Sequence, residues 1–212
     1  MHKNSYAVAP SSVDIDVCDE IIRIGELFDS GVAKTGRKDA TAGITRSSTV
    51  SWLTEQQADK HDINLEGMYN NLNSVMGEAA QNAGWGEWVI NNVQPYQYTK
   101  YGPGDHYDWH PDSFQDPMPE DDPNAGLIRK LSFTLLLSDP DDYEGGGLLI
   151  EDHQRSGPDE IWNRITNMNV VPEYTQKGTM IVFPSHLWHK VLPIKRGIRK
   201  SLVGWFMGPP WV

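Results

Sequence analysis

A histidine and an aspartate two positions apart, His110 and Asp112, are the residues of this chain best suited to bind one metal ion together. In an extended segment, residues i and i+2 point to the same side, so an imidazole nitrogen and a carboxylate oxygen can share an ion. A useful site needs a third ligand, and the best candidate is His189 in the downstream segment Phe183 to Pro193. Two histidines and one carboxylate leave coordination positions open for substrate chemistry.

The pattern around these residues is more specific than the His-x-Asp pair, which alone is a weak signal in a chain with seven histidines. Tyr101-x-x-Gly-x-x-Tyr-x-x-His-x-Asp112 precedes His189-x-Val-x-Pro-x-x-x-Gly-x-Arg199-x-Ser201. Together the two motifs resemble the prolyl-4-hydroxylase-like branch of the Fe(II)/2-oxoglutarate-dependent dioxygenases, especially the bacterial and viral PKHD-type hydroxylases. The resemblance is close over roughly Trp88 to Pro209.

The resemblance implies a reaction and a set of cofactors. His110, Asp112 and His189 would bind Fe(II), with 2-oxoglutarate as cosubstrate, O2 as oxidant and ascorbate as reductant. The reaction would hydroxylate an unactivated C–H bond and release succinate and CO2. We expect the substrate to be a peptidyl proline, with another amino-acid side chain or a small metabolite as the alternatives.

Arg199 is the candidate for holding the cosubstrate. On one strand, Arg199 and Ser201 share a face, and an arginine that points into a barrel needs an anionic partner such as a carboxylate. In the family, a basic residue at this offset binds the distal carboxylate of 2-oxoglutarate, and a structural ion pair is the alternative. The resemblance makes the Tyr101 hydroxyl a second donor, unless this ring only packs in the barrel wall, and Ser201 can add a further hydroxyl.

Two features of the site stay open at this level. Some prolyl hydroxylases carry Gly-Gly-Glu-Thr where this chain has Gly145-Gly-Gly-Leu148, and the threonine helps to bind 2-oxoglutarate. Leu148 has no hydroxyl, so the number of contacts to the cosubstrate carboxylate is undetermined. Aromatic residues near the motifs are candidates for the substrate entrance, with core packing as the alternative: Tyr107, Trp109, Trp188 and Trp205.

The elements that must position these residues are mainly strands. Apolar periodicity predicts two helices, and β-branched or alternating runs predict strands separated by glycine and proline turns. This pattern indicates a sandwich or jelly roll, and the resemblance sharpens it to a double-stranded β-helix with N-terminal helices packed outside. We expect a single domain, 1–212, with helical support in 1–87 and the catalytic core in 88–209. The expected helices are 12–28 and 64–82, the strands 44–53, 88–101, 129–138, 148–150, 178–183 and 199–206, and the loops 29–42, 113–126 and 154–174.

Composition limits the partners. The net charge of −11 argues against a nucleic-acid backbone as the main partner, which disfavours oxidative demethylation of nucleic acid, the second enzymatic interpretation. The third interpretation is a non-catalytic jelly-roll binding module. Such a module would not need both a complete set of metal ligands and Arg199 ten residues after His189. A single cysteine excludes an intrachain disulfide, and the absence of a signal-peptide or membrane-spanning run favours a cytoplasmic location.

Overall fold

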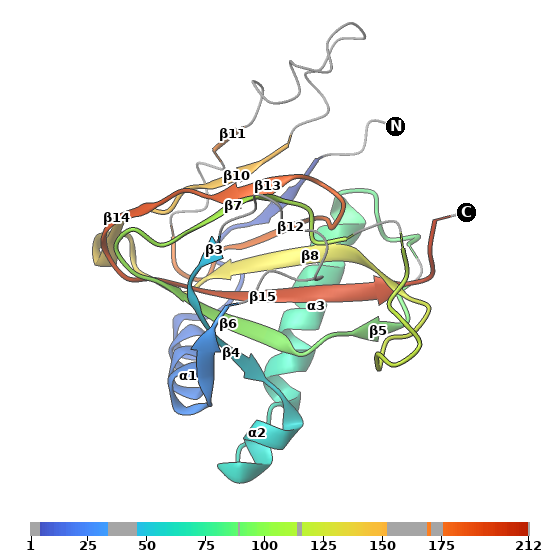
Figure 1. Cartoon of the computed structure of the whole chain (residues 1–212), viewed down its shortest axis with the longest axis horizontal. Coiled ribbons are helices and arrows are strands. Elements are labelled where there is room, and N and C mark those ends of the chain that lie inside the picture. The colour runs from blue at the N-terminus through green and yellow to red at the C-terminus, as the bar shows by residue number, and fades with distance from the viewer. Residues whose placement is uncertain are drawn as a thin grey trace, which may run out of the picture.

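Two antiparallel sheets build the protein, which a computed structural model describes over residues 5–33, 46–88, 90–113, 116–151, 169–170 and 176–211 (Figure 1). The larger sheet runs in the order β1 (Ala7–Ala9), β12 (Met180–Pro184), β8 (Ile128–Leu136), β15 (Arg199–Gly208), β6 (Tyr96–Tyr101), β4 (Thr49–Leu53) and β2 (Ser30–Val32), and β5 (Asn92–Val93) also pairs with β15. The smaller sheet runs in the order β11 (Asn169–Val170), β10 (Leu148–Ile150), β13 (His189–Val191), β7 (His106–His110) and β3 (Arg46–Ser47).

A short ribbon joins one end of this sandwich. It is formed by β9 (Tyr143–Gly145) and β14 (Ile194–Gly197), and a 3₁₀ turn, η1 (Pro140–Asp142), leads into it. An apolar cluster that includes Leu136, Phe183 and Val191 fills part of the space between the two main sheets. The mainly β jelly-roll prediction, with helices outside the sandwich, is therefore confirmed.

Helices cover the outer face of the larger sheet (Figure 1). α1 (Ile15–Leu27) and α3 (Glu66–Asn82) bury Ile21 and Leu72 in one cluster with the sheet residues Tyr98 and Leu202. Gly25 lets α1 lie directly on the sheet, because a Cβ atom there would come within 2.3 Å of the Tyr98 ring. A short helix, α2 (Glu55–Lys60), precedes α3 and begins at a Thr54 cap that accepts a hydrogen bond from the Gln57 backbone.

The N-terminal part contributes more than the predicted helical support. β1, β2 and β4 belong to the larger sheet and β3 belongs to the smaller one, so the division at residue 87 does not describe the sheets. The predicted strand 44–53 is two strands in different sheets, separated by Ser48 alone. β1 and α2 were not predicted, and β2 lies in the expected loop 29–42, of which 34–42 is outside the described residues.

Three further boundaries differ from the sequence prediction. The expected strand 88–101 is broken before Pro95, which cannot donate to a sheet ladder, so the continuous strand starts at Tyr96. Residues 194–197, for which no strand was predicted, form β14. The described part of loop 113–126 forms turns, whereas most of loop 154–174 lies outside the described residues, apart from β11. No helix in the described ranges is long and apolar enough to span a membrane.

Candidate active site

The three predicted metal ligands come together at one end of the smaller sheet. His110 is the last residue of β7 and pairs with His189, the first residue of β13. Their ring centroids lie 4.1 Å apart. Asp112 lies just beyond β7 rather than within the extended strand, and its backbone N–H donates to the Ser185 carbonyl at 2.9 Å. One ligand atom from each of the three residues lies within 4.8 Å of the others.

Backbone carbonyls fix the protonation of both imidazoles. The Nδ1 atom of His110 lies 2.7 Å from the Asp108 carbonyl, and that of His189 lies 3.0 Å from the Leu187 carbonyl. A carbonyl only accepts hydrogen bonds, so each Nδ1 must carry the proton and each Nε2 offers a lone pair. The two Nε2 atoms face the Asp112 carboxylate at 3.9 and 3.5 Å, which is the arrangement expected of oriented metal ligands.

The same environment sets the charge of the ligands. Burial lowers the pKa of His110 to about 3, and the neighbouring His189 acts in the same direction. Burial alone would raise the pKa of Asp112, but the two histidines and Arg129 outweigh it and lower that pKa to about 2. At neutral pH the site therefore offers a neutral His110 imidazole and a carboxylate anion. Two nitrogen donors and one oxygen donor on one side of an ion suit Fe(II).

A pair of serines orients the Asp112 carboxylate. The Ser132 hydroxyl donates to Oδ2 at 2.8 Å and lies 2.8 Å from the Ser185 hydroxyl. Because the Ser132 proton is used on the carboxylate, Ser185 must be the donor between the two serines. Neither serine was predicted from the sequence.

The metal-ligand group opens into a cavity of about 170 Å³ between the two sheets. Its larger-sheet wall is one face of β6, β8 and β15, since residues directly opposite in an antiparallel pair point to the same side. Arg199 lies opposite Tyr101, and Val203 lies opposite both Gln97 and Thr134. All five of these residues line the cavity together with Ser201.

Arg199 is a fully buried part of this wall. Its side chain is 1% exposed, and Nη1 donates to the Ser201 hydroxyl at 3.2 Å. The guanidinium carbon lies 5.6 Å from the centre of the Tyr101 ring. Gly146 permits this packing: its φ is +65°, and a Cβ atom there would come within 2.8 Å of the Arg199 side chain. A buried guanidinium with a serine hydroxyl beside it can bind a carboxylate.

Of the predicted entrance residues, Tyr107 and Trp205 line the cavity and Trp109 and Trp188 do not. The Trp109 ring packs outside, with the Lys190 ammonium 5.4 Å from its centre, and Trp188 is 44% exposed. If side chains alternated strictly along β7, Tyr107 and Trp109 would point to the same face of the smaller sheet. A register shift in the β13–β7 pairing breaks that alternation, and Tyr107 instead stacks on His110 at a centroid distance of 3.4 Å.

Sequence reasoning missed six polar or aromatic residues of the cavity wall. Thr134 adds a hydroxyl to the wall of the cavity, which Leu148 also lines. Polar residues at alternate positions of an apolar strand, Ser132 and Thr134, were a signal that could have revealed it. The other missed residues depend on pairing between distant segments and had no such local signal: Arg46, Trp52, Gln97, Arg129 and Phe183.

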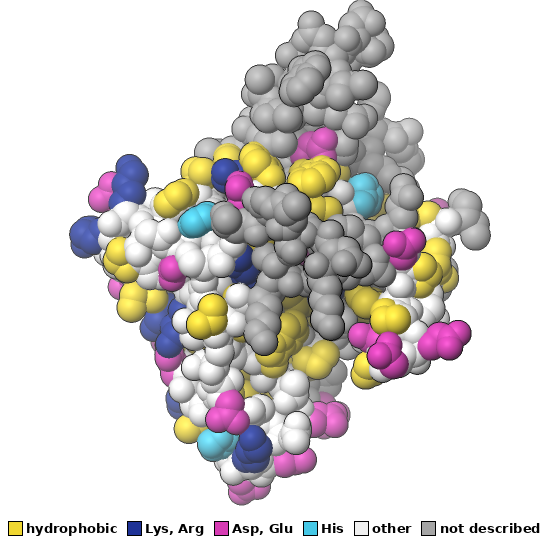
Figure 2. All heavy atoms as spheres, in the orientation of Figure 1, with side chains coloured by type: hydrophobic (Ala, Val, Ile, Leu, Met, Phe, Trp, Pro, Cys, Tyr) yellow, Lys and Arg dark blue, Asp and Glu magenta, His cyan; other side chains and the backbone are white. Residues whose placement is uncertain are grey.

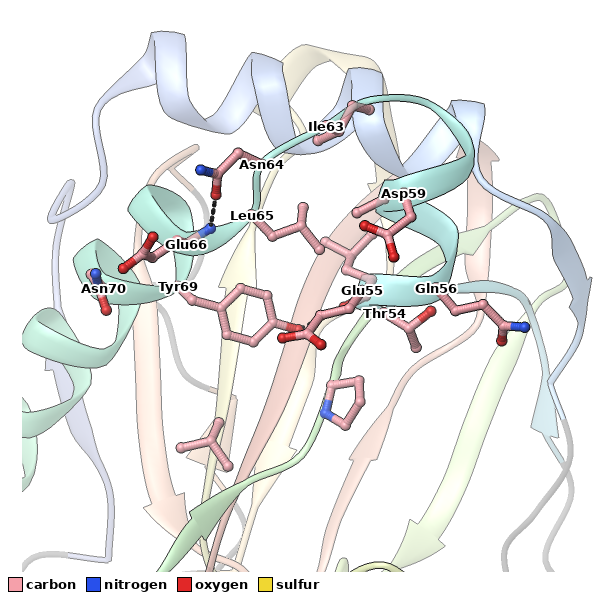
Figure 3. A pocket seen from close by; sticks show the side chains of 14 residues that line it. Thr54, Glu55, Gln56, Asp59, Ile63, Asn64, Leu65, Glu66, Tyr69 and Asn70 are labelled. Carbon is pink, nitrogen blue, oxygen red and sulfur yellow. Dashed lines mark hydrogen bonds between the residues drawn. The ribbon is translucent and has the colours of Figure 1, made fainter.

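A second, wider concavity of about 940 Å³ lies between α2 and α3 (Figure 3). Glu55, Asp59 and Glu66 stand around it, but no histidine or cysteine lines it. Its one tyrosine is engaged in the fold, because the Tyr69 hydroxyl donates to the Leu53 carbonyl at 2.7 Å and accepts from the Tyr96 N–H at 2.8 Å. Within the described ranges, the cavity between the sheets is the one that holds a metal-ligand group.

Comparison with known proteins agrees with this geometry. The family model of the 2OG-Fe(II) oxygenase superfamily matches residues 96–207. A PKHD-type hydroxylase of Idiomarina loihiensis is 31% identical over 87% of this chain and 76% of its own length. A PKHD-type hydroxylase of Herminiimonas arsenicoxydans is 33% identical over 52% of this chain and 42% of its own length. The chain therefore spans less than half the length of some relatives that it matches.

Among solved structures, a prolyl-4-hydroxylase from Pseudomonas putida has the same fold. It superimposes with a TM-score of 0.57 over 96% of this chain and 92% of its own chain, at 21% sequence identity. At that identity the likeness concerns the jelly roll and not the substrate.

Proposed function

Because the chain belongs to the 2OG-Fe(II) oxygenase superfamily, we propose that it hydroxylates an unactivated C–H bond of an amino-acid side chain, with peptidyl proline as the first candidate. The main support for this proposal is that His110, Asp112 and His189 line the same cavity as Arg199. Metal donors and a carboxylate-binding group that share one cavity support a ternary site for metal, 2-oxoglutarate and substrate.

Two groups of cavity residues have separate roles, one in binding the metal and the other in binding the cosubstrate. His110, Asp112 and His189 would hold Fe(II), and the lone pairs for this are already oriented by the carbonyls of Asp108 and Leu187. When bound, Fe(II) and 2-oxoglutarate supply the oxidising power to place one atom of O2 in a C–H bond and the other in succinate, with loss of CO2.

Arg199, Tyr101 and Ser201 would fix the cosubstrate by its distal carboxylate. The fork of Arg199 suits two carboxylate oxygens, and the hydroxyls of Tyr101 and Ser201 lie on the same wall. Thr134 offers a further hydroxyl in place of the one that Leu148 lacks. The surrounding apolar side chains of Phe183 and the Trp205 ring would exclude water.

The experiment is incubation with a proline-rich peptide library, Fe(II), ascorbate and 2-oxoglutarate. We expect peptides heavier by one oxygen atom, with an equal yield of succinate. If an alkylated oligonucleotide, and no peptide, stimulated succinate release, nucleic-acid demethylation would replace this proposal.

A separate anaerobic titration with Fe(II) and 2-oxoglutarate tests the binding-module alternative. We expect the charge-transfer absorption of the chelated cosubstrate, and a non-catalytic module would not give it. Ascorbate dependence and a cytoplasmic location stay predictions.

A further inference from the structure

The cavity carries more positive charge than the proposed chemistry uses. Three guanidiniums, those of Arg46, Arg129 and Arg199, line it with the single carboxylate of Asp112. Under the proposed function, the charges of Fe(II) and 2-oxoglutarate cancel, and Arg199 is occupied by the cosubstrate. Arg46 and Arg129 then remain, in a chain whose net charge is −11. On the face in Figure 2, acidic side chains gather at the lower end and the right side.

Arg46 reaches into the cavity from the smaller sheet. It lies opposite Tyr107 in the β3–β7 pair, with its guanidinium carbon 4.5 Å from the centre of that ring. Its Nε donates to the Ser48 hydroxyl at 3.0 Å and its Nη2 donates to the Gln97 side chain at 2.9 Å. Both partners are neutral, and no carboxylate within the described ranges forms an ion pair with Arg46. Nη1 makes no hydrogen bond to the residues that the structure describes and can donate to a ligand.

Arg129 reaches into the same space from the larger sheet. Its guanidinium carbon lies 3.9 Å from the centre of the Trp205 ring, and its Nε donates to the Gln94 side chain at 2.7 Å. Nη1 makes a long contact of 3.4 Å with the Asp112 carbonyl, and the Arg129 charge also acts on the Asp112 carboxylate. The Nη2 group makes no hydrogen bond to any other part of the chain that the structure describes.

The two arginines act on the same point of the cavity. The Arg46 guanidinium lies over the Tyr107 ring and the Arg129 guanidinium over the Trp205 ring, and all four side chains line the same cavity. Burial lowers the pKa of Arg129, the charges of Asp112, Tyr107 and Asp122 oppose that shift, and the charge of Arg46 adds to it. The two cations therefore repel each other beside Tyr107, which itself stacks on His110. An anion placed between them would relieve this repulsion.

We infer that the substrate presents a carboxylate to Arg46 and Arg129 close to the carbon that is hydroxylated. This inference rests on the proposed function and narrows its substrate class. The carboxylate is either the free α-carboxylate of a terminal residue or the side chain of an acidic residue next to the target. The rings of Trp52 and Trp205, with centroids 5.9 Å apart, line the same cavity and would contact the apolar part of the substrate.

Two matched ligand pairs test the inference by calorimetry on the full chain, loaded anaerobically with Fe(II) and 2-oxoglutarate. The first pair is a proline-ending peptide with a free carboxylate or an amide. The second is a blocked peptide with Asp or Asn next to proline. In one of the two pairs, we expect the charged ligand to bind at least about tenfold more tightly than its neutral partner. A preference in the first pair would identify a terminal carboxylate, and a preference in the second would identify an acidic side chain.

The variant to compare is Arg46→Gln, which keeps polar partners for Ser48 and Gln97 and leaves the metal ligands untouched. In this variant the charged and the neutral ligand should bind with about equal affinity, while 2-oxoglutarate affinity stays at the wild-type value. Arg196→Gln, an exposed arginine on β14, is the matched control and should keep the preference.

Three outcomes would overturn the inference: equal binding of charged and neutral ligands, no binding of either charged ligand, or an unchanged preference in Arg46→Gln. These outcomes are distinct from failure of the proposed function. That failure would appear as a missing Fe(II)–2-oxoglutarate absorption band, or as no peptide-stimulated succinate release after oxygen is admitted. Stimulation by an alkylated oligonucleotide alone would assign the arginine pair to a phosphate and also reject the carboxylate.

Discussion

The two faces of the larger sheet are built by the same strands and differ in almost every physical respect. On β15, Leu202 points outward to the helices, while Ser201 points into the cavity. On β6, Tyr98 packs under α1, while Gln97 bonds to Arg46 inside. The outer face is specified by volume, the inner face by charge and hydrogen bonds. Because the side-chain period of a strand is two, a register slip of one residue would exchange the two faces.

The largest expected effect lies on the inner side of this comparison. Asp112→Ala removes the only carboxylate of the metal-ligand group, so Fe(II) affinity should fall sharply and 2-oxoglutarate turnover should disappear. The melting temperature should stay close to the wild-type value. Metal titration and succinate assays measure this, with the exposed Asp121→Ala as control. Turnover at the wild-type rate in Asp112→Ala would reject the ligand assignment.

Two neighbouring residues of β15 contrast the faces directly. Arg199→Ala should weaken 2-oxoglutarate binding by on the order of 2–4 kcal/mol, because it removes a buried, charge-assisted fork, while iron still binds. Lys200→Ala, one residue away on the outer side near Glu26, should leave that affinity unchanged. Tyr101→Phe should act in the same direction as Arg199→Ala, but more weakly. Calorimetric titration with 2-oxoglutarate compares the three, and equal affinities in wild type and Arg199→Ala would contradict the assignment.

The outer face should respond to volume. A Cβ atom on Gly204 would come within 2.3 Å of the Phe133 ring and 2.7 Å of the Tyr96 ring, so Gly204→Ala should destabilise the fold by about 1–3 kcal/mol. Gly77→Ala is the control, since a Cβ atom there meets nothing within 4 Å and alanine favours the helix α3. Urea unfolding measures both. A Gly204→Ala protein as stable as wild type would show that the rings are not closely packed.

The smallest expected effect is a pH dependence on the outer face. Burial would raise the pKa of Glu26, but hydrogen bonds from Lys100 and Tyr98 outweigh it and lower that pKa below 4.5. The unfolded chain therefore takes up this proton first on acidification. The stabilisation is present above pH 4.5 and is lost as the pH falls through the lower, folded value.

Glu26→Gln isolates this contribution. Its side chain is 40% exposed, so solvent screening limits the loss at neutral pH to about 1 kcal/mol or less. The difference in free energy of unfolding between wild type and Glu26→Gln should shrink from pH 7 to pH 3. A difference that grows on acidification would reverse the sign of our argument.

The sequence was most informative where chemistry and local spacing coincide. His110, Asp112 and His189 belong to motifs with fixed offsets, and the structure brings them together as those offsets indicated. Arg46 could not be found in this way, because its position depends on pairing with Tyr107 far along the chain. Trp109 was expected at the entrance because it lies beside His110 in the motif, but the register shift in the β13–β7 pairing leaves it outside the cavity lining. Local patterns thus identified the ligands, whereas long-range pairing decided which other residues surround them.

The crossing from β3 to β4 has a mechanical consequence. Ser48 alone separates a strand of the smaller sheet from a strand of the larger one, and a single residue bridges its neighbours with steps of about 3.8 Å between Cα atoms. The gap between the sheets beside Arg46 is thus set by covalent geometry and cannot widen unless β3 or β4 unpairs. Side-chain replacement can change what this aperture recognises, but admitting a bulkier molecule here would require lengthening the backbone at Ser48.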